Sequence, residues 1–300
     1  MKFAAISAIA VAQAQIVAKP DHWGIIVAGS TGFGNYRHQA DACHAYQILK
    51  KAGIPEDQII HFNYDDAADS RYQHSDHKGK LFNKPTKAGV EGEDVYAGCN
   101  IDFRGRTATA ANLLSVMKGD PVADGTKTLK SDSESKIFFY YADHGAPGLV
   151  AMPVGQYLYA DKLYETVEYM HQNGMYKEMV MYMEACEGGS MFEKFDYKKL
   201  DVYATSATNG KVSSWGTYCS PQDKVNGTSV GSCLGDLYSV NWMEDTDAHD
   251  RKYKETLKTQ YETVKKMTTK SPVQEFGSLD VIQKEPIGHF ESIQNDAEVS

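Results

Sequence analysis

Short apolar runs that end in glycine or polar residues recur along the chain and predict buried strands. The clearest are Trp23–Ala28, Ile137–Tyr141 and Met179–Met183, each of which is apolar or nearly so throughout. Two further strands are predicted over Gln58–Tyr64 and Leu200–Ser206. The chain therefore supplies several short strands to one sheet.

Segments between these strands have the spacing of amphipathic helices. In Ala160–His171, the apolar residues Leu163, Val167 and Met170 fall on one face. Arg37–Lys51 ends in two lysines, and a glycine and a proline follow as stop signals. Strand–helix–strand units normally join parallel strands by a right-handed crossover, so the pattern predicts an α/β domain with a mostly parallel sheet. Further helices are predicted over Ala108–Met117, Leu234–Asp245 and Tyr253–Lys266.

Reactive side chains follow two of the predicted strands. His144 comes shortly after Ile137–Tyr141, and Cys186 comes shortly after Met179–Met183. Parallel strands end at the same edge of a sheet, where open α/β folds bind ligands, so we expect these side chains to emerge together. An imidazole and a thiol in that position can perform nucleophilic catalysis. Alone, each would more often be an ordinary loop histidine or a buried cysteine, but the pairing favours a catalytic site.

The residues around Cys186 favour a thiolate and a bound oxyanion. A helix predicted over Met191–Phe195 would place its N-terminus near the sulfur, where the helix dipole favours negative charge. The backbone N–H groups of Gly145 and Cys186 are placed to form an oxyanion hole. Gly145 has no side chain and so leaves room for a substrate carbonyl.

Composition and charge narrow the function classes. The 300 residues are 42% hydrophobic and carry a net charge of -9, with no cluster of basic residues of the kind that binds nucleic acid. Met1–Ala14 has an early lysine, an apolar run and a small-residue end, which predicts a secretory signal peptide. No later run reaches the ~18 apolar residues that a membrane span needs. The mature protein is expected to be soluble, and either lumenal or secreted.

The five cysteines are an odd number, so at least one is unpaired or pairs between chains. Cys219 and Cys233 flank a loop-like stretch, and the secretory context favours a disulfide between them. Cys43 is predicted to lie in the core, and the pattern assigns no role to Cys99. Asn226 opens an Asn-Gly-Thr triplet that is a glycosylation acceptor.

Motifs for a cofactor or a metal are weak. Gly29–Gly34 fits neither the dinucleotide fingerprint nor the phosphate-binding loop. His74 and His77 lie three residues apart without a second pair of ligands, so solvated histidines are predicted there. No cofactor and no metal are expected.

Several long motifs resemble the legumain family, the asparaginyl endopeptidases of the caspase-like cysteine peptidases. They are ADHGAPG, MEACEGGSMF, VAGSTGFGNYRHQADACHAYQILKKAGIP and SSWGTYC…SCLGDLYSVNWMEDTD. The resemblance covers Trp23–Thr268, and the WGTYC…C insertion is closer to plant vacuolar processing enzymes than to animal legumains. Thr31 and Gly188 depart from the usual Asn and Ser of the family without removing a catalytic group. The family resemblance implies a caspase-like three-layer sandwich.

The resemblance also implies roles for individual residues. Cys186 is then the nucleophile, His144 the acid and base, and Asn35 the residue that orients His144. Asp143 matches a family position that forms a succinimide linked with peptide ligation, although an ordinary hydrogen-bonding loop aspartate is an equal interpretation. The pocket for a substrate asparagine matches five residues: Arg37, His38, Glu184, Ser214 and Asp236. A guanidinium can donate to the carbonyl oxygen of an amide side chain, and carboxylates opposite it can accept from the amide nitrogen.

By the same resemblance, the partners are protein and peptide substrates with exposed Asn, and cystatin-type inhibitors. The expected location is the secretory pathway, in a lysosome-like or vacuolar compartment or outside the cell. The domains predicted are a signal peptide (1–14), a peptidase domain (15–268) and a tail or short activation peptide (269–300), with no helical prodomain. Asn295, before Asp296, is a candidate self-cleavage point.

The function predicted is a cysteine endopeptidase that cleaves after Asn, and after Asp at acidic pH, with peptide ligation as a second outcome. One alternative is an enzyme related to the catalytic subunit of the GPI-anchor transamidase, which shares the NYRH motif and the His/Cys pattern. Another is a catalytically silent secreted protein that binds ligands in the same cleft.

Overall fold

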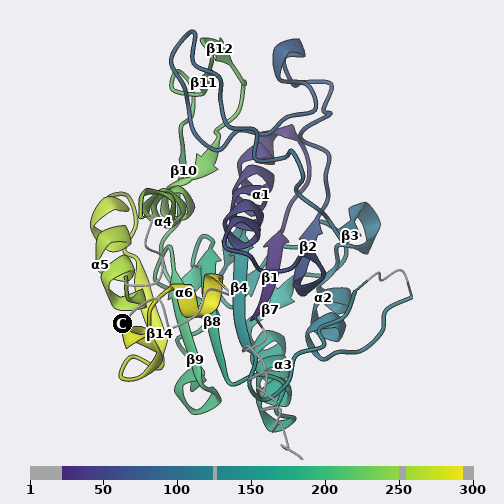
Figure 1. Cartoon of the computed structure of the whole chain (residues 1–300), viewed down its shortest axis with the longest axis vertical. Coiled ribbons are helices and arrows are strands. Elements are labelled where there is room, and N and C mark those ends of the chain that lie inside the picture. Colours follow the sequence, from purple (N-terminus) through teal and green to yellow (C-terminus); the bar gives the residue numbers. More distant parts are fainter. Residues whose placement is uncertain (1–21, 124–126, 250–254, 293–300) are drawn as a thin grey trace, which may run out of the picture.

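The computed structural model describes residues 22–123, 127–249 and 255–292. The predicted signal peptide and Asn295 lie outside the described residues. The domain forms around one central sheet with helices on both of its faces (Figure 1).

The central sheet has seven strands in the order β14-β9-β8-β4-β1-β2-β3. Six of them run parallel, and β14 at one edge runs antiparallel to β9. All residues of β1 and β4 are buried, as is usual for strands covered on both faces. The strands are β1 (His22–Ala28), β2 (Ile59–Asn63), β3 (Phe103–Arg104), β4 (Lys136–Ala142), β8 (Glu178–Glu184), β9 (Val202–Ser206) and β14 (Gln274–Gly277).

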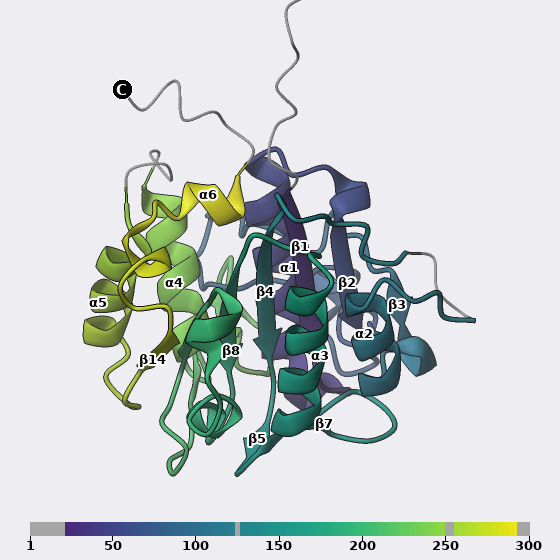
Figure 2. The ribbon, with the colours of Figure 1, turned by 90° about the horizontal axis from the view of Figure 1, so that it is seen from below.

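Helices cover the sheet in two layers, which Figure 2 shows from below. On one face, α1 (Tyr36–Lys51), α4 (Leu237–Ala248), α5 (Leu257–Met267) and α6 (Gly288–Glu291) share a hydrophobic cluster with Ile26, Tyr140 and Tyr182. On the other face, α2 (Ala110–Met117) and α3 (Ala160–Gln172) pack against Ile25, Phe139 and Met181. Neighbouring residues of each strand thus point into opposite cores. The predicted α/β class, three layers and mostly parallel sheet are confirmed.

Smaller elements lie at the ends of the central strands. A three-stranded sheet of β5 (Gly145–Ala146), β6 (Leu149–Val150) and β7 (Leu158–Tyr159) follows β4. Two antiparallel pairs of short strands lie between β9 and α4 in the sequence. They are β10 (Gly216–Thr217) with β13 (Gly235–Asp236), and β11 (Lys224–Val225) with β12 (Thr228–Ser229). Among the described residues, no helix has the length and apolar character needed to cross a membrane.

The segment after Thr268, predicted to be a tail or short activation peptide, is folded onto the domain as far as it is described. Phe276 lies in β14, and Phe290 packs into the core beside α1 and β4. Lys136 at the start of β4 contacts Glu285 Oε2 at 2.5 Å and Glu178 Oε2 at 2.8 Å. The segment therefore completes one sheet edge and one helical layer.

Two disulfides close loops of very different length. Cys219 pairs with Cys233, as predicted, across 14 residues. Cys43 on α1 pairs with Cys99, across 56 residues, which the sequence pattern does not indicate. Cys186 is the free cysteine.

Removing the longer disulfide is expected to cost more stability than removing the shorter one. Loop-closure entropy assigns about 4 kcal/mol to the 56-residue loop and about 3 kcal/mol to the 14-residue loop. We therefore expect C43A/C99A to lower the urea midpoint of unfolding more than C219A/C233A. Equal midpoints in the two double variants would contradict this ranking.

Candidate active site

The carboxyl ends of β4 and β8 lie side by side and carry the predicted His144 and Cys186. Ala142 and Glu184 are paired in the parallel register, so each reactive residue lies two positions beyond a paired one. The Asp143 N–H also donates to the Glu184 carbonyl at 3.0 Å, which ties the two loops together. The prediction that both residues emerge on one rim of the sheet agrees with this placement.

The backbone after β8 turns sharply at Cys186. Glu187 has a φ of +50°, in the left-handed region, and a short 3-10 helix, η5 (Gly188–Met191), follows. The helix predicted over Met191–Phe195 is therefore wrong: turns follow η5, and Met191 and Phe192 are buried in the core instead. The half-buried thiol lies 3.8 Å from both the carbonyl and the hydroxyl oxygen of Ser214.

Asn35 fixes the orientation of His144. The Asn35 Nδ2 group donates to the Thr31 carbonyl at 2.8 Å, so its Oδ1 faces His144 Nε2, also at 2.8 Å. His144 must then carry its proton on Nε2, which leaves Nδ1 as the basic nitrogen. Burial lowers the pKa of His144, and the positive charge of Arg37 acts in the same direction while Asp143 opposes it. The imidazole is thus kept neutral into mildly acidic solution.

Gly145 allows the two loops to approach each other. A Cβ at this position would overlap the Cys186 carbonyl oxygen and lie 3.0 Å from the Ala185 Cβ. The Ala151 N–H donates to the His144 carbonyl, so the neighbouring Gly145–Val150 pair is a non-hydrogen-bonded pair of the antiparallel ladder. The Gly145 N–H consequently points away from β6. Within the described chain, the Cys186 N–H has no backbone acceptor either.

Replacing Gly145 by alanine is expected to reduce catalysis while leaving the fold intact. The added methyl group must push the His144 and Cys186 loops apart, because its nearest neighbour is backbone. A displaced oxyanion donor typically costs about 10²–10³ in kcat. Gly148→Ala is the control for general loop damage, since a Cβ at Gly148 meets nothing within 4 Å although its positive φ adds some strain. Equal activity of the two variants would contradict the steric argument.

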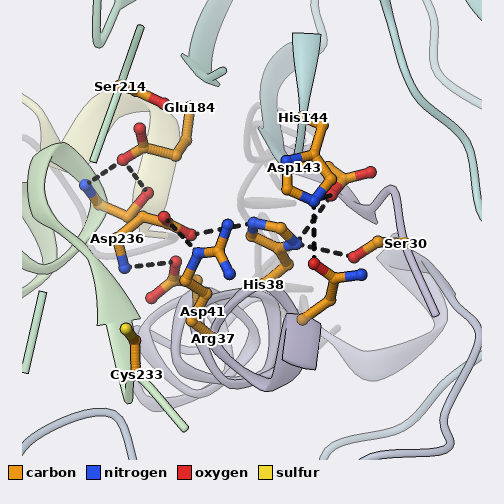
Figure 3. A network of polar contacts seen from close by, with 12 residues as sticks. Ser30, Arg37, His38, Asp41, Asp143, His144, Glu184, Ser214, Cys233 and Asp236 are labelled. Carbon is orange, nitrogen blue, oxygen red and sulfur yellow. Dashed lines mark hydrogen bonds and ion pairs between the residues drawn. The ribbon is translucent and has the colours of Figure 1, made fainter. Parts of the chain in front are cut away.

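Arg37, His38, Glu184, Ser214 and Asp236 gather beside this rim, and we refer to them as the recognition cluster (Figure 3). Arg37 in the first turn of α1 donates from Nε to Asp236 Oδ1 at 2.8 Å. Asp236 comes from the end of β13, directly before α4. Gly216 on β10 packs closely against the Arg37 side chain, since a Cβ there would lie 3.2 Å from Arg37 Cδ. Elements distant in sequence therefore converge on one guanidinium.

His38 is buried between two carboxylates. Its Nδ1 lies 2.7 Å from Asp143 Oδ1 and 2.7 Å from the Ser30 hydroxyl, and its Nε2 lies 3.4 Å from Asp236 Oδ2. The His38 ring also meets the His144 ring edge-on, with 5.0 Å between centroids. His38 thus joins the recognition cluster to the residues beside Cys186.

Glu184 is the most deeply buried carboxyl of the recognition cluster. Its Oε2 accepts hydrogen bonds from the Ser239 N–H at 2.9 Å and the Ser239 hydroxyl at 3.0 Å. Its Oε1 is buried without a hydrogen-bond partner among the described residues. Burial, together with the negative charge of Asp236, raises the pKa of Glu184 to about 8. In acidic solution Glu184 is therefore a neutral carboxylic acid whose Oε1 still lacks a hydrogen-bond partner among the described residues.

The raised pKa of Glu184 makes the folded protein more stable in acid. The folded state holds a proton on Glu184 up to about pH 8, whereas the unfolded chain loses it near its ordinary pKa of 4.5, so the free energy of unfolding falls as the pH rises between these values. We expect the Tm to fall by roughly 5–10 °C over that range. Glu184→Gln should flatten this dependence, and an unchanged slope in that variant would refute the assignment to Glu184.

Some residues of the site lie inside the family motifs but were not singled out by the sequence analysis. Ser30, Asp41 and Ser239 each contact a member of the recognition cluster through a side-chain oxygen. Asp41 lies four residues after Arg37, so both fall on one face of α1, and that spacing could have indicated it.

The remaining predicted positions lie elsewhere. Asn226 is exposed at the turn between β11 and β12, and its Oδ1 accepts from the Gly89 N–H at 2.8 Å. His74 Nδ1 accepts from the Asp76 N–H at 3.3 Å, while His77 is buried with Nε2 3.3 Å from the Thr228 carbonyl. The prediction of solvated histidines is therefore wrong for His77, which packs against Phe82 and lies beside the Thr228 carbonyl.

Comparison with known proteins gives a consistent group of relatives. The family model described as the peptidase C13 family matches residues 22–293. The chain is 48% identical over 250 residues to a vacuolar-processing enzyme of Ricinus communis, covering 82% of this chain and 49% of that protein. It is 44% identical over 259 residues to a legumain of Canavalia ensiformis, covering 85% and 53%. The chain thus spans about half the length of the curated relatives it matches.

A solved structure with a similar chain path is caspase-1 of Spodoptera frugiperda. Its TM-score is 0.49 at 10% sequence identity, with 87% of each chain covered.

Proposed function

Because the chain belongs to the peptidase C13 family, we propose that it is a cysteine endopeptidase that cleaves peptide bonds after asparagine. The observation that carries the proposal is the convergence of Cys186, His144 and the recognition cluster on one rim of the sheet. The names of the relatives, vacuolar-processing enzyme and legumain, support the same class of activity.

In the first step the Cys186 sulfur attacks the carbonyl carbon after the substrate asparagine. His144 Nδ1 accepts the thiol proton and then delivers it to the amine that leaves. Asn35 keeps the opposite nitrogen of the ring protonated, so the imidazole cannot turn its proton toward the sulfur. The products of this step are a thioester on Cys186 and a free peptide amine.

The tetrahedral oxyanion is held by the N–H groups of Gly145 and Cys186. Neither group is used by the backbone ladders described around it, so both are available to a developing negative charge. The close contact of the two loops at Gly145 sets the distance between these donors. Water then hydrolyses the thioester with His144 as base, while an incoming peptide amine would give ligation instead.

The recognition cluster suits an amide side chain. The Arg37 guanidinium donates to the amide carbonyl, and the carboxyl oxygens of Glu184 and Asp236 accept from the amide nitrogen. A glutamine would place its amide one methylene too deep. An aspartate would bring a negative charge toward Asp236 unless acid protonates it. Large discrimination arises in such sites because the wrong side chain leaves buried polar groups unpaired.

We also propose the substrates, inhibitors, compartment and modifications that were predicted together with this function. The substrates are proteins and peptides with exposed Asn, and cystatin-type proteins are the expected inhibitors. The relatives' names support a vacuolar or lysosome-like compartment. The secretory pathway is the route that the predicted signal peptide gives. Asn226 is exposed as a glycosylation acceptor must be, and Asp143, buried against His38, is the succinimide candidate.

Mass spectrometry of a matched peptide series tests the proposal. The peptides differ only at one position, which is Asn, Asp, Gln or Ala, and are incubated with the protein at acidic and neutral pH, with and without an acceptor peptide. Cleavage after Asn alone at neutral pH, and after Asp as well in acid, is the expected result. Joined peptide would demonstrate ligation. Alkylation of Cys186 that proceeds without cleavage of any peptide would favour a silent binding protein.

A further inference from the structure

A chain of buried polar side chains leads from the recognition cluster to the surface of α4. Asp236 donates from its backbone N–H to Asp41 Oδ2 at 3.1 Å. Asn83 Nδ2 donates to Asp41 Oδ1 at 2.6 Å, and Asn83 Oδ1 lies 2.7 Å from His44 Nδ1. His44 Nε2 lies 2.9 Å from Asp247 Oδ2, whose side chain is 24% exposed. Asp41, Asn83 and His44 are at most 3% exposed.

We propose that Asp41, Asn83 and His44 act together as positioning residues that hold Asp236 in the recognition cluster and set the preference between an amide and a carboxyl side chain at the cleavage position. We call these three residues the relay. The inference rests on the proposed function, because it concerns the substrate preference of that same site.

The direction of each hydrogen bond in the relay is fixed by its neighbours. Asn83 Nδ2 has two acceptors, Asp41 Oδ1 and the Leu234 carbonyl at 2.9 Å, so the amide cannot be turned around. Asn83 Oδ1 is therefore an acceptor, and His44 Nδ1 must donate to it. His44 Nε2 faces a carboxylate oxygen, which also needs a donor. The relay is complete only while His44 donates from both ring nitrogens, to Asn83 Oδ1 and to Asp247 Oδ2.

The other end of the relay is a carboxyl group crowded by negative charge. Burial, together with the charges of Asp236 and Glu184, raises the pKa of Asp41 well above its ordinary value. Among the described residues, the titratable or charged groups that interact with Asp41 include these four: Asp236, Glu184, Arg37 and Tyr140. Arg37 is the one cation among these four, and Asp236 already accepts its Nε proton.

A protonated Asp41 keeps both of its accepted hydrogen bonds and donates its own proton to the Asp236 carboxylate. In that state the positive charge of Arg37 faces a single negative charge, which Asp236 and Asp41 share. When Asp41 ionises, an extra negative charge lies behind Asp236, where it repels a substrate carboxylate but not a neutral amide. Asp41 does not need to touch the substrate to have this effect.

The backbone directly before Asp236 packs closely against the relay. A Cβ on Gly235, directly before Asp236, would lie 2.8 Å from Asn83 Nδ2 and 2.9 Å from Asp41 Oδ1. The strand β13 therefore passes directly against the relay. Any displacement of Asp41 or Asn83 is transmitted to the backbone that carries Asp236.

The test compares two peptides that differ only in Asn or Asp at the cleavage position. The ratio of their kcat/KM values is measured at several pH values from acidic to neutral for the wild type, Asp41→Asn and His44→Gln. Asp223→Asn is the matched control: Asp223 is also fully buried and accepts from a backbone N–H and a hydroxyl, but in the loop beside β11.

We expect Asp41→Asn to lower kcat/KM for the Asn peptide by about tenfold, because one of its two donor neighbours then faces an NH2 group. The Asn-to-Asp ratio should rise less steeply with pH than in the wild type, since the amide introduced at position 41 cannot ionise and only the ionisation of the substrate carboxyl remains. The rate of Cys186 alkylation by iodoacetamide should stay within about twofold of the wild type in all variants. His44→Gln should change the ratio in the same direction and carries the test if Asp41→Asn does not fold.

A ratio with wild-type size and pH dependence in both variants would overturn the inference, and so would equal changes in Asp223→Asn. If the wild type cleaved neither peptide, the proposed function would fail instead. The relay would then be tested by NMR of the histidine rings, in which Asp41→Asn should shift the His44 signals because Asn83 hydrogen-bonds to both Asp41 and His44. Unshifted signals would also overturn it.

Discussion

Cys186→Ala is expected to abolish the cleavage of Asn peptides, with a loss in kcat of about 10⁵ or more. The thioester cannot form without the sulfur, so hydrolysis and ligation must disappear together. Because Cys186 is the free cysteine and half-buried, its replacement by the smaller alanine opens little of the core, and the Tm should stay within a few degrees.

The measurement is the yield of both product types by mass spectrometry, with folding monitored by circular dichroism. Tyr157→Ala is a suitable matched control for surface change, since Tyr157 is exposed on the segment before β7 and makes no described contact with the rim. If the cysteine variant kept ligation while losing hydrolysis, the shared acyl intermediate would be disproved.

Arg37→Met should lower kcat/KM for the Asn peptide by about 10³, with alkylation of Cys186 nearly unchanged. Methionine fills the space of the arginine stem but removes the donor for the amide carbonyl, and it leaves the buried Asp236 without its ion-pair partner. Arg37→Lys should recover only part of the loss, because an ammonium cannot reproduce the planar geometry of the guanidinium.

Steady-state kinetics with Asn and Ala peptides checks this expectation. The selectivity for Asn should collapse, so that the two peptides become similarly poor substrates. A variant that lost activity on both peptides in proportion, with slower alkylation as well, would show that Arg37 supports the fold or the Cys186 loop rather than the recognition of Asn.

Local patterns predicted the part of the site that depends on strand order. Apolar runs with a polar end mark β4 and β8, and a crossover helix between them requires parallel strands, so His144 and Cys186 had to meet. The family motifs then gave the recognition cluster, whose members come from α1, β8 and the end of β13.

Features that depend on tertiary context were not predictable. The Cys43–Cys99 pair links a helix to a loop 56 residues away, and nothing in the spacing indicates that these two meet. The residues Gln274–Gly277 become a strand because β9 offers an unpaired edge, although their own composition is weakly strand-like. The helix expected after Cys186 fails because Gly188 and Gly189 favour a tight turn, and Met191 and Phe192 are drawn into the core.

The antiparallel strand β14 also affects how prone the chain is to aggregate while it is being synthesised. Until residues 274–277 have left the ribosome, β9 is a bare edge of five buried residues next to an already formed core, and such edges recruit strands from other molecules. Addition of β14 replaces that edge with a four-residue strand that ends in glycine and offers little length for further pairing. Protection of the β9 edge against aggregation is therefore acquired late in synthesis, and a chaperone would be most useful to this protein just before the last strand is added.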